Sequence, residues 1–290
     1  MKIYFNGKLV DKQDAKVSVF DHGFLYGDGA FEGIRSYGGR VFRLEQHIDR
    51  LYETMHTLMI NPGLNKKEMT AAVVATLKAN KIANGYIRLI VSRGDGDLGL
   101  DPRKCFGKPN VVIIANSSIT LYPAELYQKG MEIITVPTVK NGPNALNPQL
   151  KSLNYLNNIL AKMEATHCGY NEAIMLEANG YIGECTGDNV FIYKKGVLST
   201  PHLGRLQGIT ADAILELAKK VKLQTVEGYI TRHELYNAEE CFLTGTAAEI
   251  IPVVKVDGRT IGNGKPGPVT KKLLDAFHKL TKTDGVKYTV

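Results

Sequence analysis

Hydrophobic and polar residues alternate along two short stretches near the start of the chain, and each stretch is split by a glycine-containing turn. The turns are Asn6-Gly7 and Gly38-Gly39. Such dipeptides supply the positive backbone angles that tight hairpin turns need. The pattern therefore predicts two β-hairpins, formed by residues 2–5 with 8–10 and by residues 34–37 with 40–42.

The period of the pattern then changes from two to between three and four. Apolar residues recur at this spacing at Leu44, Ile48, Leu51, Met55 and Leu58. Because this spacing places them on one face, we expect an amphipathic helix over 44–60. Further runs predict a helix over 66–78 and strands over 86–92 and 110–116.

The second half of the chain repeats this order of strands and helices. After Lys151 the spacing predicts a helix whose apolar face packs in the core, with Leu153, Leu156, Leu160 and Met163 on that face. Strands are expected over 132–139, 172–176, 181–184, 189–193 and 240–243, and helices over 210–221 and 268–281. Strands followed by helices, twice, favour two α+β domains with a site in the cleft between them.

We expect a small domain over residues 1–120, a connection over 121–131 and a larger domain over 132–290. No apolar run is long enough to span a membrane. The four cysteines are scattered, so we expect neither a metal site nor a disulfide framework, but reduced thiols in the cytoplasm. The net charge of +7 is not gathered into a basic cluster with aromatics, which favours anionic small ligands over nucleic acid.

Lys151 lies where a proline-containing extended segment is expected to give way to the helix. The positive end of a helix and reduced hydration both disfavour an ammonium group, so this position would leave a nucleophilic amine. A lysine that binds a carbonyl compound covalently needs such surroundings. The residues alone still favour the alternative, a solvated surface lysine.

The run from Leu150 to Asn157, Leu-Lys-Ser-Leu-Asn-Tyr-Leu-Asn, resembles the cofactor-lysine segment of the fold-type IV pyridoxal-phosphate aminotransferases. The resemblance extends over nearly the whole chain. It implies a two-domain fold-type IV enzyme with pyridoxal 5′-phosphate as cofactor, and it implies that Lys151 carries that cofactor.

The resemblance also implies residues around the cofactor. Backbone N–H groups at the start of a helix suit a phosphate, and Gly208, Ile209, Thr210 and Thr246 match the family's phosphate-binding elements. Arg50 matches its phosphate-binding arginine. Glu184 matches the carboxylate that faces the pyridine nitrogen, and Tyr155 matches a hydroxyl near the cofactor's 3-oxygen.

The substrate residues are implied by two further runs. Residues 26–35, Tyr-Gly-Asp-Gly-Ala-Phe-Glu-Gly-Ile-Arg, resemble the signature of the branched-chain aminotransferases, and residues 86–88, Tyr-Ile-Arg, resemble its second signature. Within these runs and the 246–247 pair, the substrate-binding residues are expected to be Tyr26, Phe31, Arg35, Tyr86, Arg88, Thr246 and Ala247. An apolar pocket with an arginine suits both leucine and glutamate.

The implied activity is amino-group transfer between L-leucine, L-isoleucine or L-valine and 2-oxoglutarate, by a ping-pong mechanism. The implied assembly is a homodimer, in which the loop Gly94–Pro102 reaches the neighbouring subunit. D-amino-acid and (R)-amine transaminases share the cofactor residues and remain alternatives, as does a ligand-binding protein without catalysis. The residues do not rank leucine, isoleucine and valine.

Overall fold

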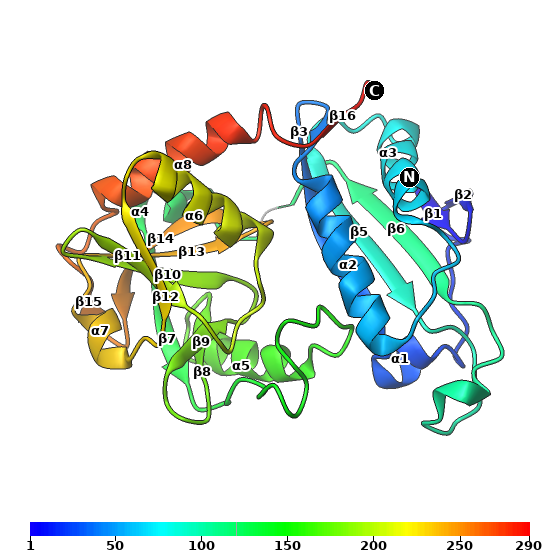
Figure 1. Cartoon of the computed structure of the whole chain (residues 1–290), viewed down its shortest axis with the longest axis horizontal. Helices are drawn as coiled ribbons and strands as arrows, with labels where there is room; N and C mark the ends of the chain where they lie inside the picture. The colour runs from blue at the N-terminus through cyan, green and yellow to red at the C-terminus, as the bar shows by residue number, and fades with distance from the viewer. Residues whose placement is uncertain (120) are drawn as a thin grey trace. The chain divides into compact units, whose positions relative to one another are not determined.

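A computed structural model describes residues 1–119 and 121–290, which form two compact units (Figure 1). The first unit comprises Met1–Ile119, Leu150–Tyr155 and Thr281–Val290. The second comprises the stretch ending at Gln149 together with Leu156–Leu280. Residue 120, the predicted end of the small domain, lies outside the described residues. Each unit combines one sheet system with helices, as the expected α+β class requires.

The sheet of the first unit has the strand order β16-β4-β3-β5-β6-β1-β2, and neighbouring strands pair antiparallel. Both predicted hairpins are confirmed, although β3 begins earlier than expected. The strands are β1 (Lys2–Phe5), β2 (Lys8–Asp11), β3 (Gly29–Tyr37), β4 (Arg40–Val41), β5 (Gly85–Ser92), β6 (Asn110–Asn116) and β16 (Val286–Lys287).

Two long helices, α2 (Leu44–Leu58) and α3 (Lys66–Ala79), cover one face of this sheet (Figure 1). The predicted apolar face of α2 is confirmed, since Leu44, Ile48 and Leu51 are fully or almost fully buried. The shorter helices of this unit are α1 (His22–Tyr26) and the 3₁₀ helix η1 (Pro102–Lys104).

Two segments from later in the sequence complete the first unit. Ser152 forms an antiparallel bridge with Ala30 of β3, and the backbone N–H of Leu153 donates to the carbonyl of Gly29 at 2.8 Å. The hydroxyl of Tyr288 donates to the carbonyl of Ile82 at 2.6 Å. These hydrogen bonds tie two later segments to the first unit. The units are therefore not contiguous in the sequence, whereas the predicted domain ranges were contiguous.

The sheet of the second unit has the order β12-β11-β10-β13-β14-β7-β8-β9, with β15 paired to β14. Its strands are β7 (Met131–Val136), β8 (Ala173–Leu176), β9 (Ile182–Cys185), β10 (Asn189–Lys194), β11 (Val197–Pro201), β12 (Gln224–Gly228), β13 (Glu240–Gly245), β14 (Glu249–Val256) and β15 (Arg259–Thr260). Its helices are α4 (Ala124–Lys129), α5 (Leu156–His167), α6 (Ile209–Lys220), α7 (Arg232–Tyr236) and α8 (Pro268–Leu280). The helix α4 lies within the predicted connection, where Leu126 packs on the second core.

The prediction for the helix after Lys151 is wrong in two respects. First, α5 begins only at Leu156, whereas Lys151 lies in the extended segment that pairs with β3. Second, the predicted core face is exposed: Leu156 is 62% and Met163 59% exposed, while the buried positions of α5 are Asn158, Ala161 and Ala165. Small residues let this helix lie close to β7 and β8, which leaves the larger apolar side chains outside.

Candidate functional site

The outer face of the first sheet, opposite α2 and α3, carries the predicted substrate residues Tyr86 and Arg88. Alternation along β5 buries Ile87 and Leu89 beneath the helices and turns Tyr86 and Arg88 to the other face. Arg88 Nη2 donates to the hydroxyl of Tyr86 at 3.0 Å. A Cβ at Gly33 would lie 2.2 Å from that hydroxyl, so the glycine of β3 makes room for the tyrosine ring.

Phe31 connects this pair to the lysine. The Arg88 guanidinium carbon lies 4.7 Å from the centroid of the Phe31 ring, and Lys151 Nζ lies 4.5 Å from the same centroid. Lys151 Nζ also donates to the hydroxyl of Tyr155 at 3.3 Å, and the rings of Phe31 and Tyr155 meet edge to face at 5.0 Å. The structure thus brings five predicted residues into one half-buried group.

The backbone holds Lys151 in place from two sides. Its carbonyl accepts from the N–H of Phe31 at 3.0 Å, and its own N–H donates to Thr54 Oγ1 on α2 at 3.3 Å. The lysine is therefore fixed by a strand edge and a helix face, and not by the start of a helix as the sequence had suggested.

The other three predicted residues of this unit have different neighbours. Tyr26 packs edge-on against His22, and its hydroxyl donates to the carbonyl of Leu98. Arg35 lies over the ring of Tyr37 at 5.1 Å. Arg50 forms two hydrogen bonds with the buried carboxylate of Glu32, which is not among the predicted site residues.

Glu184 in the second unit is buried and held at both carboxylate oxygens. Lys140 Nζ lies 2.7 Å from Oε1, while Asn189 Nδ2 and the backbone N–H of Leu206 each donate to Oε2 at 3.0 Å. Lys140 is itself buried. It lies in an irregular stretch after β7, where no local pattern identifies it.

The start of α6 lies next to Asn189, one of the residues that bond to Glu184. Gly208 is its N-cap, and in the described part of the chain no side chain caps this end. A Cβ at Gly208 would lie 2.0 Å from Asn189 Oδ1, which explains the need for glycine. Ile209 and Thr210 form the buried first turn, which places the free backbone N–H groups of the helix start beside the Thr210 side chain.

Thr244, at the end of β13, carries an unusual side chain. It is 1% exposed, and its Oγ1 has no hydrogen-bond partner among the described residues. Thr244 pairs with Asn189 across β13 and β10, so the two side chains share one face of the sheet. A buried hydroxyl without a partner is rare, and it has the capacity to bond to a bound polar group. Thr246 and Ala247 follow in the turn to β14.

Glu172 and Asp188 form a buried acidic pair in the same unit as Glu184. The hydroxyl of Tyr122 lies 2.8 Å from Glu172 Oε2 and 2.7 Å from Asp188 Oδ2. One hydroxyl can donate only one proton, so one carboxyl must donate in return. Glu172 accepts from the N–H groups of Ala173 and Thr186, which favours its ionised form. Burial, together with that carboxylate, raises the pKa of Asp188 to about 7, so we assign the proton to Asp188.

The Asp188 proton should make stability depend on pH. The folded chain holds this proton up to pH about 7, whereas an unfolded chain releases it near the ordinary pKa of 3.8. The stabilisation is therefore complete below about pH 4 and is lost as pH rises through about 7, on the order of a few kcal/mol. We expect Asp188→Asn, whose amide still donates to Tyr122, to flatten this decline.

Thermal unfolding midpoints at about pH 5 and about pH 8 measure the effect. Asp49→Asn, which removes an exposed carboxylate from α2, is the control and should retain the wild-type decline. A full wild-type decline in Asp188→Asn would mean that another group holds the proton.

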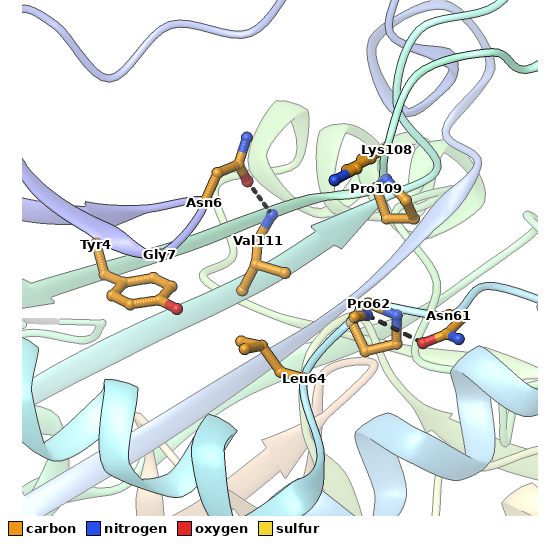
Figure 2. Close-up of a pocket in the computed structure, with 10 residues that line it drawn as sticks. Tyr4, Asn6, Gly7, Asn61, Pro62, Leu64, Lys108, Pro109 and Val111 are labelled. Atoms are coloured by element: carbon orange, nitrogen blue, oxygen red, sulfur yellow. Dashed lines mark hydrogen bonds between the residues drawn. The ribbon is translucent and has the colours of Figure 1, made fainter.

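A separate cavity of about 390 Å³ lies in the first unit, between the β1–β2 turn, the segment that joins α2 to α3, and the start of β6 (Figure 2). Tyr4, Leu64 and Val111 line it, and Asn6 Oδ1 accepts from the N–H of Val111 at 2.8 Å. Its lining residues include none of the predicted cofactor or substrate residues, so the candidate chemistry lies elsewhere.

Within residues 1–119 and 121–290, no helix has the length and apolar character needed to cross a bilayer. Over the same residues, histidine, cysteine and carboxylate side chains form no group of three or more that could hold a metal ion. The four cysteines are free thiols.

Comparison with known proteins gives a consistent result. The family model described as amino-transferase class IV matches residues 29–256. A Methanocaldococcus jannaschii protein, provisionally named branched-chain-amino-acid aminotransferase, is 52% identical over 289 residues, which cover 99% of each chain.

Solved structures agree with this match. The crystal structure of the Escherichia coli branched-chain amino acid aminotransferase has a TM-score of 0.94 and 37% identity, covering 97% of this chain and 94% of that one. The branched-chain aminotransferase of the thermophilic archaeon Thermoproteus uzoniensis, solved with norvaline, has a TM-score of 0.91 and 35% identity, covering 97% and 95%.

Proposed function

The chain belongs to the class IV aminotransferases, and on that premise we propose that it transfers amino groups between L-leucine, L-isoleucine or L-valine and 2-oxoglutarate, with pyridoxal 5′-phosphate as cofactor. The single observation that supports this most strongly is the group formed by Lys151, Tyr155, Phe31, Tyr86 and Arg88, which combines a lysine amine with an apolar wall and a guanidinium.

The described residues fit this cofactor. An aldehyde needs an amine, and Lys151 Nζ lies beside a phenol hydroxyl that can share its proton. A phosphate needs N–H donors and hydroxyls, and the uncapped start of α6 and the partnerless Thr244 hydroxyl offer them. The cofactor, when bound, supplies an electron sink for the bonds at the substrate α-carbon.

Each residue has a proposed role in that chemistry. Lys151 holds the cofactor and then moves a proton at the substrate α-carbon as base and acid. Glu184 keeps a proton on the pyridine nitrogen, and Tyr155 orients the Lys151 amine. Gly208, Ile209, Thr210, Thr246 and Arg50 bind the phosphate, while Thr246 and the Ala247 N–H meet the substrate carboxylate.

The substrate side chain is proposed to lie against Phe31 and Tyr86, with Tyr26 and Arg35 as further members of the pocket. Apolar ring faces suit the leucine side chain. The guanidinium of Arg88, which Tyr86 and Phe31 hold in place, suits the distal carboxylate of glutamate. One pocket can therefore accept both substrates.

Half-reactions with single amino acids test the proposal. The purified protein, loaded with pyridoxal 5′-phosphate, is mixed with L-leucine, L-glutamate, D-leucine or an (R)-amine, and the cofactor absorbance is followed. L-leucine and L-glutamate should convert the cofactor. Conversion by D-leucine or the amine, without conversion by L-leucine, would favour the alternative transaminases and contradict the proposal.

Arg88→Leu should separate the two substrate types. A hydrogen bond from arginine to a buried carboxylate contributes roughly 1.5–3 kcal/mol, so the half-reaction with L-glutamate should slow about ten- to a hundredfold. The half-reaction with L-leucine should stay within about threefold, since leucine has no distal charge. Lys66→Leu, at an exposed position of α3, is the control. Equal losses with both amino acids would mean that Arg88 is structural.

A homodimer is proposed as the working assembly. Large apolar side chains are exposed on α1 and the loop that follows β5, at Phe24, Leu98, Leu100 and Phe106. The outer face of α5 exposes Leu156, Ile159, Leu160 and Met163 in the second unit. Monomeric proteins rarely expose such patches, and a second copy of the chain is the proposed partner. The free thiols support a reducing compartment, and we place the enzyme in the cytoplasm.

A further inference from the structure

Glu32 is a charged residue on the buried face of β3. Alternation along the strand turns it toward α2 together with Ala30 and Ile34, and all three are 0% exposed. The flanking Phe31 and Gly33 turn to the opposite face, where the lysine lies. A carboxylate in an apolar layer is unfavourable unless it is fully paired, so its partners define what it does.

The partners come from one face of α2. Arg50 donates through Nε to Oε1 and through Nη2 to Oε2, both at 2.8 Å, which is a two-point contact that fixes the plane of the guanidinium. His47, three residues earlier, lies with Nδ1 2.7 Å from Oε2. Thr54, four residues later on the same face, accepts from the Lys151 backbone.

The charges of this group are well defined. Burial alone would raise the pKa of Glu32, but Arg50 and His47 outweigh it and lower the pKa to about 2. Burial lowers the pKa of His47, and the charges of Arg50 and Lys151 lower it further. The Glu32 carboxylate raises the pKa of His47, but it does not outweigh these effects. At neutral pH the carboxylate is thus ionised and the imidazole neutral, with its Nδ1–H donating to Glu32.

We propose that Glu32 and His47 are positioning residues that hold the Arg50 guanidinium in the orientation in which it binds the phosphate of the cofactor. The inference rests on the proposed function, in which Arg50 is a phosphate residue. An arginine with free rotamers would lose conformational freedom on binding an anion. In this protein the two-point contact with Glu32 has already fixed the side chain, and His47 fixes the carboxylate.

Two forms of the cofactor test the proposal without any measurement of activity. Dissociation constants are measured for pyridoxal 5′-phosphate and for pyridoxal, which lacks the phosphate. The dissociation constant of pyridoxal divided by that of pyridoxal 5′-phosphate reports how much the phosphate contributes to binding. We expect Glu32→Gln to reduce this ratio about tenfold, because the amide can accept only one of the two Arg50 hydrogen bonds and lacks the charge. Arg50→Gln should reduce it at least as much, and the double variant no further.

Asp49→Asn is the matched control, since Asp49 precedes Arg50 on α2 and pairs with Lys66 at 2.7 Å on the exposed side. It should leave the ratio within about twofold. If Glu32→Gln does not fold, as judged by its thermal unfolding, His47→Gln replaces it. That variant keeps the Glu32–Arg50 pair and should reduce the ratio by a smaller but measurable factor.

The outcomes distinguish the inference from the function. A large loss in Arg50→Gln, with the ratios of Glu32→Gln and His47→Gln equal to that of Asp49→Asn, would overturn the positioning role and leave the proposed function intact. If the wild-type protein bound pyridoxal as tightly as its phosphate ester, the phosphate role of Arg50 and the proposed function would both fail.

Discussion

Replacement of Lys151 with alanine is expected to slow amino-group transfer by at least about 10³-fold. A positioned acid–base group alone contributes roughly 10²–10⁴-fold, and the variant also loses the amine that holds the cofactor. The Lys151 amine lies against Phe31 and Tyr155. Replacement of Lys151 with alanine removes the amine and leaves both aromatic residues in the site. The loss should therefore appear in the rate with little change in folding.

Two measurements check this expectation. Single-turnover rates with L-leucine compare Lys151→Ala with Lys66→Ala, which removes an exposed amine from the first unit. Borohydride reduction of the cofactor-loaded wild type, followed by peptide mapping, should place the label on Lys151. A label on any other lysine would contradict the assignment. Lys151→Ala should still retain some cofactor through its phosphate residues.

Glu184→Gln is expected to have two large effects, one on rate and one on stability. Loss of the charge that keeps a proton on the ring nitrogen should slow the half-reaction on the order of a hundredfold. The same change leaves the buried Lys140 ammonium, which lies 2.7 Å from Oε1 of Glu184, without its counter-charge. Removal of one partner from a buried ion pair destabilises a protein by about 3–5 kcal/mol.

The double variant Glu184→Gln with Lys140→Met separates these effects. Without the unpaired ammonium, the free energy of unfolding should return most of the way to the wild-type value, as denaturant unfolding would measure. The half-reaction should stay slow, because the ring nitrogen still lacks its carboxylate. Recovery of the rate in the double variant would instead mean that Glu184 serves only to neutralise Lys140.

The sequence predicted most strands and helices because each of them packs one face in a core. That packing gives the apolar residues of the element a regular spacing. The apolar spacing at Leu44, Ile48 and Leu51 corresponds directly to their burial in α2. The same reasoning was wrong for α5, where Leu156 and Met163 have equally good spacing but are exposed. Periodicity identifies an apolar face, and only the packed structure decides whether that face meets the same chain.

Glu32 and Lys140 were not among the predicted site residues, and they differ in whether the sequence carries a signal for them. Glu32 has a signal: it stands between the buried positions Ala30 and Ile34 of an alternating strand, where a charge requires a partner. Lys140 has none, since it lies in an irregular stretch and meets Glu184 only through the fold. The pairing of the Lys151 segment with β3 is likewise a long-range contact that no local pattern encodes.

The first unit consists of three separate stretches of the chain, so it cannot be completed until the last stretch has been synthesised. On the ribosome, Met1–Ile119 is synthesised first, Leu150–Tyr155 follows, and Thr281–Val290 comes last. Until the later segments emerge, the edge of β3 lacks its hydrogen bonds from Leu153. The buried hydroxyl of Ser36 likewise lacks Tyr288, its neighbour at 2.6 Å. The β3 edge can close once Leu150–Tyr155 is made, but β4 lacks its partner strand β16 until the end of translation, so this last ladder closes only after the second unit has been made.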